Sequence, residues 1–153
     1  MMDAMDVLPP RFAWLGSARV IGFASTPRGA LALREAAAGV YYIRIDGIYT
    51  LDIYQRGFLA KMQAELPKHE AIHLFTDGWD AVGYEGAVRT AATDFMIEHH
   101  AKVTGAVLLV RSRLVAMGAN TAAMILALRG IRLHVHSELV VFEQALRSAV
   151  DGR

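Results

Sequence analysis

The segment IHLFTDGWDAVGYEGAVR, residues 72–89, joins a strand pattern to a helix pattern, and the rest of the chain is interpreted outward from it. Residues 71–76 are mostly apolar and are followed by an Asp-Gly pair, which is typical of the end of a strand. After a loop predicted over residues 77–85, apolar side chains recur every three or four positions, as on one face of a helix. We therefore predict a strand, a loop and a helix that extends over residues 84–100.

The alternation of strand and helix continues to the end of the chain. Residues 103–110 form the most apolar run, which is typical of a strand buried on both faces of a sheet. Helical spacing follows over residues 112–129, then a short strand pattern over residues 131–135 and a last helical pattern that ends near residue 150. The expected helix ends are amino-terminal caps at Ser112 and Ser137 and a carboxyl-terminal glycine at Gly130.

Three strands and a helix are predicted before the quoted segment. The strands are expected at residues 19–24, 30–34 and 40–45, with turn-forming residues between the first two. Apolar side chains at helical spacing predict a helix over residues 51–66, with Thr50 as its cap and Pro67 at its end. Three successive strands indicate an antiparallel start to the sheet, whereas the later strands, separated by helices, favour parallel pairing.

The summed order, βββαβαβαβα, predicts an α/β fold with a single central mixed sheet of about six strands and four helices. A chain of 153 residues, of which 54% are hydrophobic, is long enough for one domain with a sizeable core. We expect one domain over residues 17–153, preceded by an N-terminal arm over residues 1–16. The arm contains Phe12, Trp14 and Leu15, and a homodimer in which they cover a neighbour's sheet edge is one expectation.

Composition excludes several classes of protein. The absence of cysteine removes disulfides, thiolate metal sites and cysteine nucleophiles. A net charge of +1 argues against nucleic-acid binding, which usually needs a basic excess. No apolar stretch approaches the roughly 20 residues of a membrane span, and residues 1–10 lack the positive charge of a secretory signal. We therefore expect a cytoplasmic protein, and abundant alanine with few lysines indicates a bacterium with a GC-rich genome.

This element order, together with residues 72–89, residues 107–113 and the closing strand and helix, resembles the STAS domain family, the SpoIIAA-like anti-sigma-factor antagonists. The resemblance extends over residues 17–150. It implies the SpoIIAA-like fold and a non-enzymatic bacterial module whose partner is a regulatory protein or a kinase-like factor.

The resemblance also implies a phosphorylation site that this chain lacks. Family members present a serine or threonine at the start of the helix after the Asp-ending strand, where a phosphate would meet free backbone N–H groups and the helix dipole. With Asp77 aligned to that aspartate, the position falls at Gly86 or Ala87, and neither has a hydroxyl. The nearest hydroxyls belong to Thr76 and Thr90. We expect a STAS-like module without the usual phospho-switch.

The segment from Asp77 to Arg89 is the predicted partner-binding surface. Open α/β sheets hold ligand sites at the carboxyl ends of their strands, and aromatic side chains are favoured at interfaces. The candidates are Asp77, Trp79, Asp80, Tyr84, Glu85 and Arg89. The structural alternative is that Trp79 covers the end of the sheet, that an aspartate caps the next helix, and that Glu85 pairs with Arg89 at the i, i+4 spacing.

A second candidate is an anion-binding corner at Arg111, Ser112 and Arg113, where two guanidinium groups and a hydroxyl open a helix. The alternative is that Ser112 only caps that helix. His134 and His136 point to one face of a strand, but zinc needs a third ligand that the pattern does not supply. We therefore expect no metal and no cofactor.

Patterns of nucleophilic catalysis are missing from the sequence. It has no G-x-S-x-G elbow and no serine and histidine with a reason to meet. The predicted function is a non-enzymatic interaction or regulatory module. Two alternatives stay open: a domain that binds or senses a small ligand, such as a nucleotide or a lipid, and a small α/β enzyme of unknown reaction.

Overall fold

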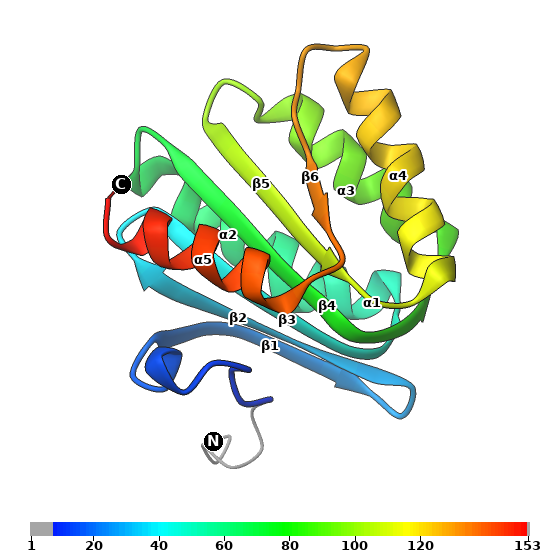
Figure 1. The fold of residues 1–153 in the computed structure, drawn as a ribbon, viewed down its shortest axis with the longest axis horizontal. Helices are drawn as coiled ribbons and strands as arrows, with labels where there is room; N and C mark the ends of the chain where they lie inside the picture. Colours follow the sequence, from blue (N-terminus) through cyan, green and yellow to red (C-terminus); the bar gives the residue numbers. More distant parts are fainter. Residues whose placement is uncertain (1–7, 153) are drawn as a thin grey trace.

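The computed structural model describes residues 8–152, and its centre is a sheet of six strands that lie side by side in chain order (Figure 1). The strands are β1 (Arg19–Thr26), β2 (Gly29–Ala37), β3 (Val40–Tyr49), β4 (Ile72–Tyr84), β5 (Val103–Val110) and β6 (His134–His136). Pairing is antiparallel from β1 to β3 and parallel from β3 to β6. The single mixed sheet that the element order predicts is confirmed.

Four helical regions pack on the sheet. The first is a rod of α1 (Leu51–Tyr54), a π-helical turn (η3, Gln55–Leu59), α2 (Ala60–Glu65) and a 3-10 turn (η4, Leu66–Lys68). The others are α3 (Gly86–Glu98), α4 (Arg113–Ala127) and α5 (Leu139–Val150), and a short 3-10 turn, η2 (Ala13–Leu15), precedes β1. None of the helices within residues 8–152 has the length and apolar character that a membrane crossing needs.

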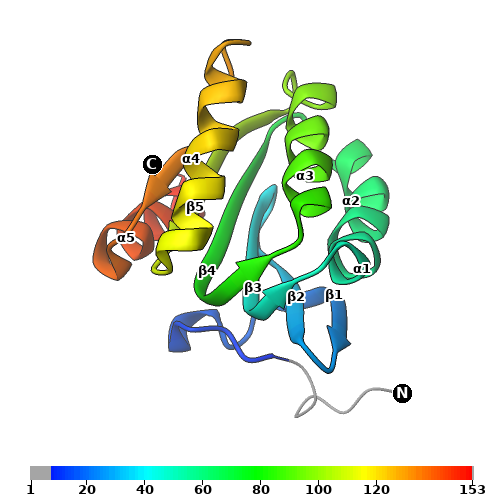
Figure 2. The same ribbon diagram turned by 90° about the vertical axis from the view of Figure 1, so that its right-hand side faces the viewer.

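The helices form two layers (Figure 2). The rod of α1 and α2, with α3 and α4, covers one face of the sheet, and α5 covers the other together with the N-terminal segment, residues 8–18. Because the order β3-β4-β5-β6 never reverses, right-handed crossovers place all the connecting helices on the same face. The parallel strands therefore lack the reversal of strand order at which open α/β sheets usually bind ligands.

Each face of the sheet has its own apolar core. The larger core lies under α1 to α4 and contains the fully buried Tyr41, Ile53 and Met62. The smaller core lies under α5 and consists of Leu15, Val40, Tyr42, Phe75, Leu109, Phe142 and Leu146. The neighbouring tyrosines of β3, Tyr41 and Tyr42, belong to different cores, as the alternation of a strand requires.

The loop predicted over residues 77–85 is wrong, because β4 continues as far as Tyr84. It stays paired with β3 throughout: Asp77 lies beside Arg44, Asp80 beside Asp46, and Tyr84 beside Tyr49. Between the first two of these pairs β4 has one residue more than β3, which is a β-bulge. The next helix, α3, accordingly begins at Gly86 rather than at residue 84.

Three of the predicted helix caps are confirmed, Thr50 at the start of α1 among them, and one is wrong. The Ser112 hydroxyl accepts a hydrogen bond from the Val115 N–H at 3.4 Å, and Gly130 has a φ of +73° after α4. Ser137 does not cap α5, because the cap position is Glu138, whose side chain makes no capping bond. The last strand begins at His134 rather than residue 131, since the backbone there still returns to α4: the Ile131 N–H donates to the Leu126 carbonyl.

The aromatic residues of the predicted arm pack within the chain. The ring of Phe12 lies 6.3 Å from that of Phe142 in α5, and the Trp14 indole N–H donates to Glu143 at 2.8 Å. Leu15 is 2% exposed. The side chains expected to cover a neighbour's sheet edge thus cover a face of this chain's own sheet. Residues 1–7 of the predicted arm lie outside the described residues.

Candidate functional site

The sheet separates the predicted partner-binding residues onto two faces. Asp77 and Asp80 contact Arg11 of the N-terminal segment, and Trp79 packs against the core under α5. Tyr84 and Arg89 line a cavity on the opposite face, under α3 and α4. Because residues 77–84 belong to a strand, their side chains are divided between its two faces and do not form one continuous surface.

Asp77 is fully buried and is held by three hydrogen-bond donors. The Tyr42 hydroxyl donates to it at 2.6 Å, the Arg11 Nε at 2.8 Å and the Trp79 backbone N–H at 3.1 Å. Burial, and next the negative charge of Asp77, raise the pKa of Tyr42 well above its ordinary value, so Tyr42 stays a neutral donor. A buried carboxylate with its oxygens satisfied in this way holds the fold together and is not exposed to a partner.

Asp80 is half-buried and connects three arginines. It accepts hydrogen bonds from Arg11 and, at 2.9 Å, from Arg44, and the Arg111 guanidinium lies 3.9 Å away. Burial by itself would raise the pKa of Asp80, but the hydrogen bonds and charges of Arg44 and Arg11 outweigh it and lower that pKa. The ionised carboxylate therefore ties the N-terminal segment to β3 and to the end of β5.

Two further contacts fasten the N-terminal segment. Arg34 donates to the Leu8 carbonyl at 2.7 Å, and Arg44 donates to the Pro9 carbonyl. Arg34 is 5% exposed and has no carboxylate partner within residues 8–152, and burial, with the nearby charge of Arg44, lowers its pKa. We call the set formed by Arg11, Arg34, Tyr42, Arg44, Asp77 and Asp80 the arginine clasp.

The ion pair predicted between Glu85 and Arg89 does not form. Glu85 instead accepts a hydrogen bond from the Leu51 backbone N–H at 2.7 Å, which links the start of α3 to the start of α1. Arg89 is half-buried beside the cavity, and no hydrogen bond or ion pair joins it to another described residue. Its guanidinium is therefore available to an anionic group.

The residues predicted as an anion-binding corner have separate roles. The Arg111 guanidinium stacks over the Trp79 ring, 5.0 Å from its centre, and approaches Asp80. Ser112 caps α4, which is the alternative to anion binding that the sequence left open. Arg113 is exposed, and in the described part of the chain it has no ion-pair partner.

The cavity lies between the sheet and the helices α3 and α4 and has a volume of about 170 Å³. Most of its wall is apolar, and its larger apolar side chains include Ile43, Ile45, Leu74, Val88, Phe95, Met96, Val115 and Leu126. The lining residues with a polar group in their side chains are Tyr49, Tyr54, Thr76, Tyr84, Arg89 and Thr93. Gly118 of α4 leaves room for the Tyr84 ring, because a Cβ at Gly118 would overlap the Tyr84 hydroxyl.

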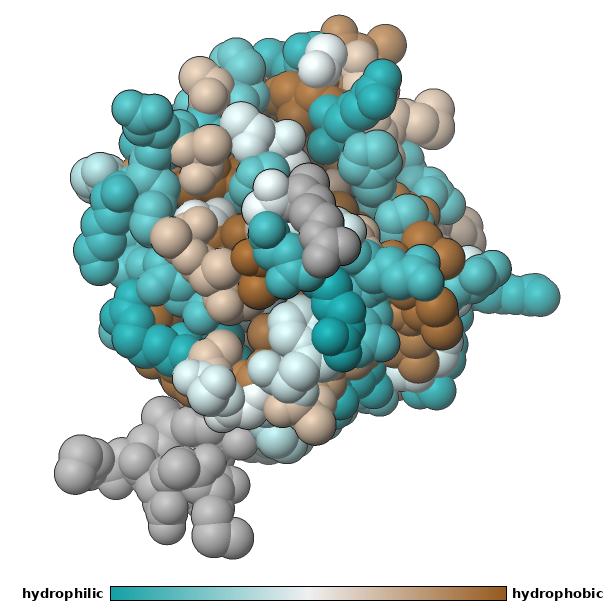
Figure 3. All heavy atoms as spheres, turned by 60° about the vertical axis from the view of Figure 1, so that its left-hand side comes forward, coloured by the Kyte–Doolittle hydropathy of each residue, from teal (hydrophilic) through white to brown (hydrophobic). Residues whose placement is uncertain are grey.

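The outer face of α4 carries an apolar stripe. Its exposed side chains are Leu114, Met117, Met124, Ile125 and Leu128, of which Leu128 is 89% exposed. Their spacings of three, seven, one and three residues place them within about 100° of the circumference of a helix with 3.6 residues per turn, so they lie along one side. The side of the molecule at the left of Figure 1 is different: it is mainly hydrophilic, with apolar side chains in small scattered groups (Figure 3).

The sequence does not reveal the arginine clasp, and its small-ligand alternative does not identify the residues of the cavity wall. Arg34 and Arg44 interrupt otherwise apolar strands, and that is a signal of buried charge, but nothing in the sequence connects them with Asp77 or with Arg11. The cavity has a weaker signal in three glycines of its wall, which have no side chain to fill the space: Gly78, Gly83 and Gly118. Both features depend on contacts between segments far apart in the chain.

No known family model matches this sequence, and no curated protein matches it. In structure the chain is similar to an uncharacterized protein from the DUF3478 family with a SpoIIAA-like fold, from Shewanella loihica PV-4, with a TM-score of 0.56. The similarity covers 80% of this chain and 98% of that chain, at 11% sequence identity. It confirms the SpoIIAA-like fold that the sequence predicts, and at this identity it concerns the fold alone.

Proposed function

We propose that this protein binds a small apolar molecule with an acidic group in the cavity under α3 and α4, within the bacterial cytoplasm. The observation that supports the proposal is an apolar space of about 170 Å³ beside Arg89, a half-buried guanidinium that no other described residue neutralises. Protein interiors are packed as densely as organic crystals, and voids larger than a water molecule are few. A space of this size is therefore unusual, and we interpret it as a ligand-binding site.

The volume selects among ligands. An engineered cavity of about 150 Å³ holds benzene, whereas pockets for drug-sized ligands have about 300 to 1,000 Å³. A nucleotide is too large and too polar for the described wall, which leaves the lipid-like side of the small-ligand alternative. A single ring or an alkyl chain of medium length has the right size.

The polar end of the cavity fits a carboxylate. Tyr84 is the last residue of β4 and Arg89 lies near the start of α3, so both line the cavity at the carboxyl edge of the sheet. A guanidinium binds a carboxylate through two parallel N–H···O hydrogen bonds. A molecule like a medium-chain fatty acid would place its chain against the apolar wall and its carboxylate beside Arg89.

Isothermal titration calorimetry with hexanoate, octanoate and decanoate tests the cavity. Each buried CH₂ contributes about 0.8 kcal/mol, so the affinity is expected to rise about fourfold per carbon until the cavity is full. The variant Ala122→Leu fills the cavity from α4 and is expected to abolish binding, whereas Ala127→Leu, at the exposed end of that helix, serves as the control. Equal binding to native protein and to Ala122→Leu would refute the proposal.

The role of Arg89 has its own test. Hydrogen bonds to a charged group contribute about 1.5 to 3 kcal/mol, so Arg89→Gln is expected to weaken octanoate binding about tenfold or more. Octanol has the same chain without the charge, and its affinity is expected to stay unchanged in the variant. A parallel loss of both ligands would show that Arg89 shapes the cavity and does not bind the acid.

A second candidate function, a protein-interaction or regulatory module, is supported by the apolar stripe on α4. Soluble monomers rarely expose contiguous apolar patches without a binding role. Basic residues stand at both ends of the helix, at Arg111 and Arg113 and again at Arg129 and Arg132, which favours a partner with an acidic rim around an apolar groove. A phospho-switch at Gly86 or Ala87 is not part of this candidate.

Pull-down with the double variant Met124→Glu/Leu128→Glu tests the stripe. Both positions are exposed, so thermal unfolding is expected to stay unchanged while the proteins captured by native protein are lost. Val82→Glu replaces an exposed apolar residue of β4 and is the matched control. The same captured proteins with all three chains would exclude the stripe as the interaction surface.

A further inference from the structure

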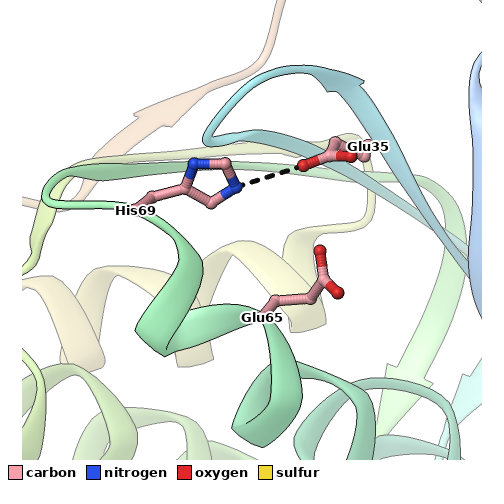
Figure 4. Close-up of side chains that lie close together, drawn as sticks. All are labelled: Glu35, Glu65 and His69. Atoms are coloured by element: carbon pink, nitrogen blue, oxygen red, sulfur yellow. Dashed lines mark hydrogen bonds and ion pairs between the residues drawn. The ribbon is translucent and has the colours of Figure 1, made fainter.

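A second cluster of chemically active side chains lies away from the cavity, where β2 meets the end of α2. Glu35 comes from β2, Glu65 is the last residue of α2, and His69 follows η4 directly. Figure 4 shows the carboxylate of Glu65 and the ring of His69 both turned toward Glu35. Among the described residues, this is the group of histidine and acidic side chains whose ligand atoms come close enough to share a metal ion.

The distances suit a metal after a small adjustment. One ligand atom from each residue lies within 4.8 Å of the other two, and His69 Nε2 is 3.2 Å from the nearer Glu35 oxygen. Zinc bonds to imidazole nitrogen and carboxylate oxygen are about 2.0 to 2.2 Å long, so ligand atoms around a tetrahedral zinc stand about 3.5 Å apart. Side-chain rotations that move the ligand atoms by about 1 Å would place them at three of the four tetrahedral positions around a zinc ion.

The surroundings hold two of the ligands in position. Tyr41 is fully buried, and its hydroxyl lies 3.0 Å from a Glu65 oxygen and 3.4 Å from a Glu35 oxygen. Glu65 is itself 4% exposed. Hydrogen bonds from a second layer of residues orient the ligands in known metal sites. Here the Tyr41 hydroxyl, which has one proton to donate, makes its shorter hydrogen bond to Glu65 and lies beside Glu35.

The cations that balance the two carboxylates come from exposed side chains. Arg19 lies 2.9 Å from Glu35 and 3.5 Å from Glu65, and Lys68 lies 2.7 Å from Glu65. The Arg19 and Lys68 side chains are 58% and 53% exposed, and exposed ion pairs contribute little to stability. Both can turn into solvent when a divalent ion takes their place.

We propose that Glu35, Glu65 and His69 bind a divalent transition metal of the zinc type, with water in the remaining position. Imidazole nitrogen with two carboxylate oxygens is a donor set that zinc accepts. The bound ion ties β2 to the end of the α1–α2 rod and so stabilises the fold. This site is independent of the cavity proposed to bind a ligand.

Titration of the full chain, without a purification tag, with zinc chloride tests the proposal. One equivalent is expected to bind and to raise the melting temperature by about 5 to 10 °C at a hundredfold excess over the dissociation constant. His69→Ala and Glu65→Gln are each expected to weaken binding about a hundredfold or more. Arg19→Ala is expected to strengthen it, because a competing cation is removed.

The paired histidines of β6 supply the control. The rings of His134 and His136 stack 6.4 Å apart, and they offer two imidazole nitrogens without a third ligand among the described residues. The variant His134→Ala/His136→Ala is expected to keep full affinity. Zinc binding that survives His69→Ala and disappears in the β6 variant would overturn the proposal, as would the absence of binding to native protein. Circular dichroism establishes that each variant is folded, and Glu35→Gln repeats the test with a conservative change.

Discussion

Asp77 is the residue on which the attachment of the N-terminal segment depends most. It is fully buried, and its replacement by alanine leaves the Tyr42 hydroxyl and the Arg11 Nε–H without their acceptor, although Arg11 keeps its ion pair with Asp80. Removal of one partner from a buried ion pair costs about 3 to 5 kcal/mol. We expect a loss of this size for Asp77→Ala in urea unfolding and about 1 to 2 kcal/mol for the half-exposed Asp80→Ala. Equal losses would contradict the assignment of Asp77 as the centre of the arginine clasp.

Asp80 gives the clasp a dependence on acid. Its pKa is lower in the folded chain than in the unfolded chain, where an aspartate titrates at about 3.9. Its ion pairs therefore stabilise the fold fully at pH values above that of the unfolded group, and this stabilisation is lost as the pH falls through the lower folded pKa. Below about pH 4, we expect the free energy of unfolding to fall more steeply in native protein than in Asp80→Asn. Identical slopes in urea titrations across that range would exclude the contribution.

Predictions from sequence succeed at the residue scale where the cause is local. Ser112 caps a helix and Gly130 ends it because both roles depend on a few neighbouring backbone groups. The roles of Asp77 and Asp80 could not be predicted in this way, since their partners, Arg11 and Arg44, lie in other segments. In the sequence they resemble residues of a binding loop, because partner binding and structural ion pairing both use carboxylates.

The π-helical turn lies against β1 at a position where two glycines meet. Gly22 of β1 lies against the Gly57 carbonyl so closely that a Cβ at Gly22 would overlap it. Backbone atoms cannot turn away as a flexible side chain can, so Gly22→Ala is expected to destabilise the fold by about 1 to 3 kcal/mol. Gly86→Ala is the control, because a Cβ there meets no atom within 4 Å and alanine favours a helix.

Differential scanning calorimetry of Gly22→Ala and Gly86→Ala checks this comparison. A lowered melting temperature for the first and an unchanged or raised one for the second are expected. Unchanged melting of Gly22→Ala would show that the rod and β1 separate easily.

The extent of β4 shows what a single sequence cannot reveal about an element. Gly78 and the acids around it are turn-forming residues, and they predict a loop. The strand continues because β3 runs beside it as far as Tyr49 and β5 pairs with its first half. Two register shifts, each with one extra residue in β4, then accommodate the residues that favour a turn. The local sequence pattern predicts that a strand exists. The length of the strand depends on the strand beside it, which the local pattern does not include.

At the scale of the whole molecule, the N-terminal segment is part of one apolar core. Leu15 is buried and Phe12 and Trp14 are partly buried under α5, and full burial of a side chain of this size contributes about 1.5 to 3 kcal/mol. Even partial contributions from all three are a large share of the total stability of a domain, about 5 to 15 kcal/mol. Deletion of residues 1–16 is therefore expected to unfold the protein or to lower its melting temperature severely.

Light scattering and thermal unfolding of the deleted chain separate two roles of the segment. A folded chain with unchanged melting and half the native mass would mean that the segment serves a dimer and not this core. The expected result is a loss of folded protein without any stable species of smaller mass.

The overall architecture could be predicted from the sequence because helix and strand periodicity, taken in order, allows few arrangements of a mixed sheet. The cavity could not be predicted, because its volume depends on how far α3 and α4 stand from the sheet and on how much of that space their side chains fill. Phe95, Met96 and Leu126 are typical core residues by sequence and form its wall. Only their arrangement distinguishes a wall from a filled core.

Methyl NMR of protein labelled at valine and leucine, recorded during addition of octanoate, tests the ligand-binding proposal most directly. We predict saturable shifts at Val88, Val115 and Leu126, which line the cavity, and none at Leu146 in the core under α5. Shifts confined to Leu114 and Leu128 on the outside of α4, or the absence of saturable shifts at the cavity wall, would contradict binding in the cavity.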